Sequence, residues 1–254
     1  MQHLPAPIHH ARDVAQLPVA IDYPAALALR QMSMVHDELP KYLLAPEVSA
    51  LLHYVPDLRR KMLLATLWNT GARINEALAL TRGDFSLTPP YPFVQLATLK
   101  QRTEKAARTV GRTPARLVPL SDSWYVSQLQ TMVATLKIPM ERRNKRTGRT
   151  EKARIWEVTD RTVRTWIGEA VATAAADGVT FSVSVTPHTF RHSYAMHMLY
   201  AGIPLKVLQS LMGHKSISST GVYTKVFALD VAARHRVQFL MPESDAVSML
   251  KRIP

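Results

Sequence analysis

Apolar side chains recur every three to four residues through most of the chain from residue 41 onward, which is the spacing of helices with one buried face. Pro46 favours the first turn of a short helix, and Asp57 is a suitable N-cap for the next one. That second helix should stop near Gly71, because glycine accepts the left-handed conformation of a C-cap. Thr70 is then expected to cap a third helix.

Four more helices are predicted in the second half of the chain. Asp122 or Ser123 begins the first of them and Thr159 caps the second. Thr186 followed by Pro187 begins the third, since proline is favoured at the first helical position. The fourth starts at Pro204 and ends at Gly213.

Two short segments have the composition of strands and flank a basic loop. Residues 93–99 and 117–120 should pair as an antiparallel hairpin, whereas the second basic stretch, residues 137–154, is expected to be a polar loop. The predicted fold class is therefore mainly α with a small antiparallel β-sheet (α+β).

The two ends of the chain carry less periodic sequence than the middle. Residues 1–40 are proline-rich and then hold one helical stretch, about 25–38, which is too little for a core of its own. We therefore expect an N-terminal arm at 1–40, one main domain at 41–230, and a tail at 231–254 with a short amphipathic helix. The apolar positions of that helix are Ala246, Val247, Leu250 and Ile253.

Cysteine is absent from all 254 residues. Disulfides, thiolate metal sites and cysteine nucleophiles are therefore excluded, and the composition suits the reducing cytoplasm. The first residues lack the apolar core of a signal peptide, and no apolar run approaches the roughly 20 residues that cross a bilayer. We expect an intracellular protein without a membrane partner.

The formal net charge is +13, and two segments supply +11 of it. Residues 100–116 hold six basic residues against one acidic residue, and residues 137–154 hold eight against two. Charge this concentrated favours a polyanionic partner, usually nucleic acid, over solvated loops with no partner. The candidate DNA contacts are Arg102, Lys105, Arg108, Arg112, Arg116, Arg142, Arg143, Lys145, Arg146 and Arg149.

Six side chains distributed along the chain suggest chemistry on a phosphodiester. Two arginines, two histidines and a lysine can surround a phosphate and stabilise the charge that grows during its displacement. A tyrosine hydroxyl can open the diester as the nucleophile. The six candidates are Arg73, Lys100, His188, Arg191, His214 and Tyr223.

The candidates near the end of the chain also have structural interpretations. His188 and Arg191 lie in the first turn of a predicted helix, where free amides and the helix dipole favour an anion, yet such a pair also suits an exposed helix face. Tyr223 follows a short polar run that could swing it into a site, although a half-buried structural tyrosine is a common alternative. His192 and His197 are interpreted as packing or surface histidines.

The earlier candidates leave two further choices open. Arg73 and Glu76 form either a purely structural ion pair or a pair in which Glu76 steadies the guanidinium for phosphate. Lys100, at the end of the first predicted strand, is suited to protonate a leaving oxygen if cationic neighbours lower its pKa. Lys105 competes with it for this role.

In this order and spacing, the motifs resemble those of the tyrosine recombinase (phage integrase) family, over roughly residues 41–230. The closest matches are residues 70–80 around the first arginine, the H-x-x-R-H-S-x-A box at 188–195, and residues 211–226. The sequence is most similar to Xer-like and plasmid-resolution members. The resemblance implies a mostly helical catalytic domain with a small β-sheet, in agreement with the pattern of elements.

The resemblance also implies a role for each candidate. Arg73 and Arg191 would clamp the scissile phosphate, with Glu76 supporting the first of them. His188 and His214 would bind the phosphate oxygens and assist proton movement.

The two remaining roles concern the bonds that change. Tyr223 would be the nucleophile, and Lys100 would protonate the leaving 5′-hydroxyl. The implied reaction is two transesterifications through a 3′-phosphotyrosyl bond, with no metal, nucleotide or other cofactor. It would serve resolution of plasmid multimers, or integration and excision of a mobile element.

The implied partner is a double-stranded DNA recombination site. In many family members a helical core-binding domain precedes the catalytic domain and closes a clamp around the DNA duplex. Here the first arginine of the motifs is already at residue 73, so only the short arm is expected before the catalytic domain. An accessory DNA-binding protein or another partner would complete the clamp, or the clamp is incomplete. The family acts as a homotetramer on DNA, and we expect residues 242–254 to pass to a neighbouring subunit.

Three other functions are alternatives for this sequence. A metal-dependent nuclease is disfavoured because no acidic cluster lies near these motifs. A catalytically inactive architectural or regulatory DNA-binding protein is disfavoured because all six matched positions hold competent residues. A type IB topoisomerase shares the chemistry, so DNA relaxation stays open as a side activity.

Overall fold

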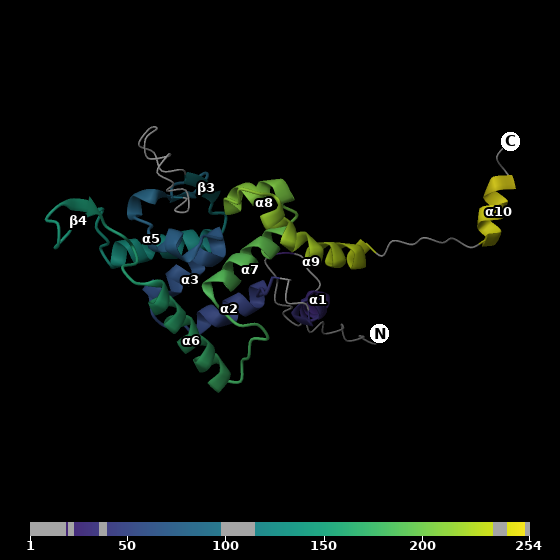
Figure 1. Cartoon of the computed structure of the whole chain (residues 1–254), viewed down its shortest axis with the longest axis horizontal. Helices are drawn as coiled ribbons and strands as arrows, with labels where there is room; N and C mark the ends of the chain where they lie inside the picture. Colours follow the sequence, from purple (N-terminus) through teal and green to yellow (C-terminus); the bar gives the residue numbers. More distant parts are fainter. Residues whose placement is uncertain (1–18, 20–22, 36–39, 98–114, 236–242, 252–254) are drawn as a thin grey trace, which may run out of the picture.

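The computed structural model describes residue 19 and residues 23–35, 40–97, 115–235 and 243–251, and helices dominate it (Figure 1). The helices are α1 (Tyr23–Val35), α2 (Ala45–His53), α3 (Leu58–Thr70), α4 (Ile74–Leu78), α5 (Ser123–Thr135), α6 (Asp160–Ala176), α7 (Pro187–Tyr200), α8 (Leu205–Met212), α9 (Ser218–His235) and α10 (Glu243–Lys251), with one 3₁₀ turn, η1 (Arg82–Asp84). The strands are β1 (Phe85–Ser86), β2 (Phe93–Ala97), β3 (Ala115–Pro119), β4 (Glu141–Arg143) and β5 (Thr150–Lys152). The predicted fold class is confirmed.

Helix α3 lies inside the larger of two apolar cores. Every residue from Met62 to Leu67 is buried, because α2, α4, α5 and α7 all pack against this helix. Asp57 caps it as predicted, accepting a hydrogen bond of 2.8 Å from the backbone N–H of Arg60. Gly71 ends it at a φ of 58°, also as predicted.

Gly71 also determines how closely α3 and α7 approach. A Cβ atom at this position would lie 2.3 Å from Cδ1 of Tyr194 on α7. Glycine is therefore required twice here, once for its left-handed backbone and once for the missing side chain.

The start of α4 corrects one prediction. Thr70 is the last residue of α3, where its hydroxyl donates a 2.6 Å hydrogen bond to the carbonyl of Thr66, so it does not cap α4. The N-cap is Arg73, whose backbone N–H donates to Oε2 of Glu76 at 3.0 Å. The glycine between them interrupts the helix and sets this later start.

The first sheet contains the predicted hairpin and one extra short strand. Its order is β1-β2-β3, and all pairs are antiparallel. In the hairpin, Phe93 pairs with Pro119 and Ala97 with Ala115. Strand β3 also packs against α8, so the hairpin touches the helix that precedes His214.

The second basic stretch is not the loop that the sequence suggested. Strands β4 and β5 form a hairpin within it, and Arg142 lies opposite Glu151. Gly148, at a φ of 68°, accommodates the turn, and the cross-strand ion pair offsets part of the repulsion between the basic residues. The abundance of charge obscured this short strand pair in the sequence.

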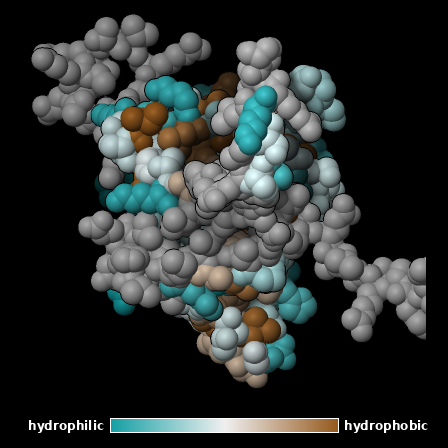
Figure 2. Space-filling view, turned by 90° about the vertical axis from the view of Figure 1, so that its right-hand side faces the viewer, coloured by the Kyte–Doolittle hydropathy of each residue, from teal (hydrophilic) through white to brown (hydrophobic). Residues whose placement is uncertain are grey.

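The smaller core joins α1 to α7, α8 and α9. Ala26 of α1 is buried in it, and α1 packs against α9. The helix expected within residues 1–40 is therefore present and contributes to the core of the described chain. Figure 2 shows the side of the molecule at the right of Figure 1, where apolar residues gather in the upper part between hydrophilic ones.

The predicted starts of α5, α6, α7 and α8 agree with the structure, whereas the start of α9 at Ser218 was not predicted. Asp122, Thr159 and Thr186 each accept a hydrogen bond from a backbone N–H in the first turn, and Pro204 precedes α8. Near the C-terminus, α10 lies apart from the other helices (Figure 1). Within the described ranges, no helix has the length and apolarity that crossing a membrane requires.

Candidate active site

The first arginine of the site stands at the junction of α3 and α4. Its Nη1 donates a 2.9 Å hydrogen bond to Oε1 of Glu76, and this carboxylate also accepts from the Arg73 backbone. Arg73 is 28% exposed along its side chain, whereas Glu76 is only 2% exposed. The carboxylate thus fixes the buried end of the guanidinium and leaves the rest open to solvent or ligand.

The second arginine, Arg191, is buried on α7. Its guanidinium donates to the carbonyls of Gly71 and Met212, the latter at 2.7 Å. Burial, followed by the charges of Arg73 and Arg116, lowers the pKa of Arg191 to about 10. The side chain therefore remains a cation at neutral pH, held by two neutral carbonyl groups.

These two arginines border one pocket of about 220 Å³. The first turn of α7 forms another wall, and it includes Pro187 and the exposed His188. Thr186 caps that turn by accepting from the backbone N–H of Thr189 at 3.2 Å. Two guanidinium groups, an imidazole and a helix N-terminus therefore face the same small volume, which favours an anion such as phosphate.

Positive charge exceeds negative charge around Glu76. The carboxylate accepts from Arg73 and also from Nη2 of Arg116 at 2.7 Å. Burial on its own would raise the pKa of Glu76, but the hydrogen bonds and charges of Arg116 and Arg73 outweigh it and lower that pKa. Glu76 is therefore ionised, and one carboxylate faces three arginines when Arg191 is included.

His214 follows the glycine that ends α8. Gly213 has a φ of 63°, and the backbone N–H of His214 donates to the carbonyl of Gln209 at 3.1 Å, as in a Schellman cap. The ring Nδ1 lies 2.9 Å from the hydroxyl oxygen of Thr220. Burial and then the charge of Arg191 lower the pKa of His214 to about 4, so the ring is neutral at pH 7.

Tyr223 lies on α9 and is only 2% exposed. The polar run that was expected to swing Tyr223 into the site is in fact the start of this helix. The Tyr223 side chain is therefore buried on a helix and does not lie on a loop. Burial raises the pKa of Tyr223 to about 12, although the charges of Arg191 and Arg73 act to lower it.

His192, which the sequence suggested to be a packing or surface histidine, lies beside Tyr223. Its Nδ1 lies 2.9 Å from the hydroxyl oxygen of Tyr223. The centroid of its ring lies 6.3 Å from that of the His188 ring, with the two rings stacked. Burial, then the charges of His188 and Arg191, lower the pKa of His192 to about 4. The i, i+4 spacing from His188 was visible in the sequence, but the partner on α9 was not.

The basic residues of the sheet hairpin divide into two groups. Lys100, Arg102, Lys105, Arg108 and Arg112 lie outside the described residues. Arg116 is described, and its side chain points inward to Glu76 and is only 9% exposed.

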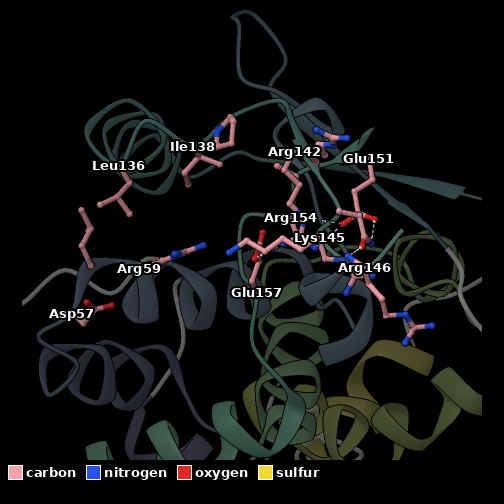
Figure 3. A pocket seen from close by; sticks show the side chains of 15 residues that line it. Asp57, Arg59, Leu136, Ile138, Arg142, Lys145, Arg146, Glu151, Arg154 and Glu157 are labelled. Carbon is pink, nitrogen blue, oxygen red and sulfur yellow. Dashed lines mark hydrogen bonds and ion pairs between the residues drawn. The ribbon is translucent and has the colours of Figure 1, made fainter. Parts of the chain in front are cut away.

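Four of the other predicted DNA contacts, Arg142, Arg143, Lys145 and Arg146, line a larger pocket, shown in Figure 3. This cavity of about 950 Å³ lies between the β4–β5 hairpin and the ends of α3 and α5, and it shares no residue with the pocket at Arg73. Arg142 forms ion pairs with Glu151, at 2.8 Å, and with Glu157. Arg143, Lys145 and Arg146 are exposed, and so is Arg149, which belongs to the same hairpin but does not line the pocket.

Within the described ranges, no group of three or more histidine, aspartate or glutamate side chains is placed to hold a metal ion. The candidate site is instead rich in cations and neutral imidazoles. Arginine and uncharged histidine donors suit direct contact with a phosphodiester.

Comparison with known proteins identifies the family. The model of the phage integrase family matches residues 41–229. The chain belongs to the phage integrase family. The resemblance predicted for residues 41–230 is thereby confirmed, and the chain is a site-specific recombinase of the tyrosine type.

Several relatives match along nearly their whole length. A "Resolvase" of Escherichia coli is 94% identical, with 99% of this chain and 98% of the relative covered. A second "Resolvase", from Escherichia coli (strain K12), is 90% identical and covers 97% and 94%. A "Probable site-specific recombinase in afa region" of Escherichia coli is 48% identical and covers 95% and 94%.

Solved structures share the fold at low sequence identity. XerA recombinase matches with a TM-score of 0.57 and 20% identity, covering 79% of this chain and 67% of that one. XerH bound to difH substrate matches with a TM-score of 0.54 and 20% identity, covering 73% and 51%. The chain thus spans about half the length of the XerH chain that it matches.

Proposed function

We propose that this recombinase cuts and rejoins double-stranded DNA through a 3′-phosphotyrosyl bond formed by Tyr223. The observation that carries the proposal is the convergence of Arg73, His188 and Arg191 on one pocket, with the charges of both arginines acting on the buried tyrosine. Family membership supports the same chemistry.

The cleavage step balances without a cofactor. The Tyr223 hydroxyl gives its proton to Nδ1 of His192, which lies 2.9 Å away, its oxygen attacks the phosphorus, and the bond between phosphorus and the 5′-oxygen breaks. That oxygen takes a proton, for which Lys100 is the proposed donor and Lys105 the alternative. A 5′-hydroxyl of the partner strand then attacks the phosphotyrosine and releases the enzyme.

Each described residue has a part in this step. Arg73 and Arg191 stabilise the negative charge that grows on the phosphate, as preorganised donors do in other enzymes. His188 and His214 bind the phosphate oxygens. His192 holds the Tyr223 hydroxyl until the phosphate arrives.

Affinity for DNA is assigned to the two basic segments. Phosphate contacts by arginine and lysine release counterions and supply most sequence-independent binding. The exposed arginines of the β4–β5 hairpin suit this role, and we propose the same for the basic residues of the β2–β3 connection.

The biological substrate that we favour is a plasmid multimer, because two relatives that are 94% and 90% identical to this chain are named resolvases. Integration or excision of a mobile element is the alternative. Either reaction would take place in the cytoplasm, where the DNA lies.

A homotetramer on two recombination sites is the proposed assembly, with an accessory DNA-binding protein completing the clamp. We further propose that residues 242–254, which include α10, dock on a neighbouring subunit. Deleting these residues should abolish synapsis on native gels while single-site binding persists, and unchanged synapsis would contradict the exchange.

Covalent capture tests the chemistry. Sheared DNA from the host bacterium is incubated with the wild-type chain in EDTA, denatured in detergent, and filtered to retain protein-linked fragments. We expect one enriched sequence with wild type and none with Tyr223→Phe. An adduct that persists in the Phe variant would refute the role of Tyr223, and no adduct from either chain would favour the inactive DNA-binding alternative.

A further inference from the structure

Arg116 occupies an unusual position for a residue of a basic hairpin. It lies on β3, where its neighbours Ala115 and Leu117 are exposed, yet its own side chain is only 9% exposed. Burial of a guanidinium is costly unless its donors are matched by acceptors, so the contacts of this side chain need an explanation.

The guanidinium joins two separate parts of the active site. Nη2 donates to Oε2 of Glu76 at 2.7 Å, and Nε donates to the carbonyl of Leu211 at 2.7 Å. Glu76 holds Arg73, and Leu211 belongs to the last turn of α8, three residues before His214. One side chain therefore connects the support of the first arginine with the helix end that carries the second histidine.

The turn after α8 is shaped to fit this side chain. A Cβ atom at Gly213 would lie 3.1 Å from both Cδ and Nη1 of Arg116. Gly213 thus provides a left-handed C-cap and also leaves space for the guanidinium. The third nitrogen, Nη1, is buried and has no hydrogen-bond partner among the described residues.

We propose that Arg116 is a positioning residue for strand cleavage, which aligns Arg73, through Glu76, with His214, through the end of α8. The inference rests on the proposed function and replaces the sequence prediction that Arg116 contacts DNA. Its charge also acts on the site electrostatically, because it helps to lower the pKa of Arg191 and of His214.

A lysine could not make the same connection. The planar guanidinium offers donors in fixed directions, so it reaches a carboxylate and a carbonyl together, whereas an ammonium group is a single point of donation. Arg116→Lys therefore keeps the charge and loses one of the two contacts. Arg116→Met removes both while retaining much of the volume.

The test uses the full-length chain and a nicked duplex built from the sequence that covalent capture enriches. Single-turnover cleavage of the saturated complex gives the rate of the chemical step, and filter binding gives the Kd. The matched control is Arg164→Met, which breaks an exposed ion pair with Asp160 on α6.

Arg116→Met should slow cleavage of bound DNA by about 100-fold, the loss that a misplacement of about 1 Å can cause, with Kd changed less than about threefold. Arg116→Lys should restore part of the rate, and the control should cleave as wild type does. Because Arg116 and Glu76 share one contact, combining Arg116→Met with Glu76→Gln should slow cleavage by clearly less than the product of the two single effects.

Three results would overturn the inference. The first is a normal cleavage rate with weakened binding in Arg116→Met, which would make Arg116 a DNA contact. The second is a multiplicative loss of rate in the double variant. The third is a wild-type cleavage rate for Arg116→Lys. The lysine variant decides the matter if the methionine variant fails to fold. Each of them differs from failure of the proposed function, in which the wild-type chain itself forms no adduct.

Discussion

Arginines occur in two different settings in this molecule. At the candidate active site, Arg116 and Arg191 are nearly buried, and Glu76 is the only carboxylate among the described residues that is hydrogen-bonded to an arginine there. In the β4–β5 hairpin the arginines are exposed or half-exposed, and Arg142 has two carboxylate partners, Glu151 and Glu157. The buried arginines carry more positive charge than Glu76 can neutralise, whereas the charge of Arg142 in the exposed hairpin is neutralised by carboxylates of the same chain.

This difference separates chemistry from affinity. A buried excess of positive charge is unfavourable until an anion enters, so the proposed active site is suited to a phosphate whose charge increases during displacement. Exposed arginines interact through water and salt, so they attract DNA over a distance but stabilise a transition state poorly. Cleavage should therefore depend on the first group, and salt-sensitive binding on the second.

The largest effect should come from Arg191→Ala. Removing a buried donor aimed at the developing charge should lower the single-turnover cleavage rate by about 1,000-fold, while DNA binding changes little because the hairpins carry most affinity. Covalent adduct formation measures the first quantity and filter binding the second. Loss of binding with a normal rate per bound complex would reduce Arg191 to a docking residue.

Gly71→Ala tests how tightly the buried region is packed. The added Cβ would meet Tyr194 at 2.3 Å and the backbone would keep a φ of 58°, so we expect a loss of about 3 kcal/mol in the free energy of unfolding. Gly148→Ala in the exposed hairpin is the matched control. It also has positive φ but open space around it, and should cost about 1 kcal/mol. Urea unfolding gives both values, and equal losses would contradict the contrast.

Acid should destabilise the buried region first. The pKa values of His192 and His214 in the folded chain, about 4, lie below the ordinary 6.5, so the unfolded chain binds protons first as pH falls. Stability should therefore decrease between about pH 6.5 and pH 4. Urea midpoints measured across this range should fall less steeply in His192→Asn than in wild type. The exposed His53→Gln on α2 is the control, and an unchanged slope in His192→Asn would refute the assignment.

The smallest effects are expected in the hairpin itself. Arg146→Ala should weaken DNA binding a few-fold and reduce the slope of log affinity against log salt by about 1, as loss of one phosphate contact does. Arg142→Ala should change the slope less, because Glu151 and Glu157 already neutralise that side chain. Salt titrations of binding decide the order, and a larger slope change for Arg142 would reverse it.

Local signals were sufficient for much of the fold. Asp57, Thr159 and Thr186 were predicted as N-caps because capping depends on a side chain and the few amides next to it. The same locality failed at Thr70, where glycine delayed the next helix, and in residues 141–152, where pairing of β4 with β5 outweighed a composition typical of loops. Strand pairing is not local, and short charged strands carry little apolar pattern.

The sequence by itself supplied the candidate reactive groups, since Arg73, Arg191, His214 and Tyr223 stand in motifs whose order and spacing together resemble those of the family. Only the tertiary structure decided which of the side chains contact one another. His192 meets Tyr223 across α7 and α9, and Arg116 turns inward to Glu76 and Leu211. Side-chain partners across elements depend on how whole helices and strands pack, and no spacing within one segment contains that information.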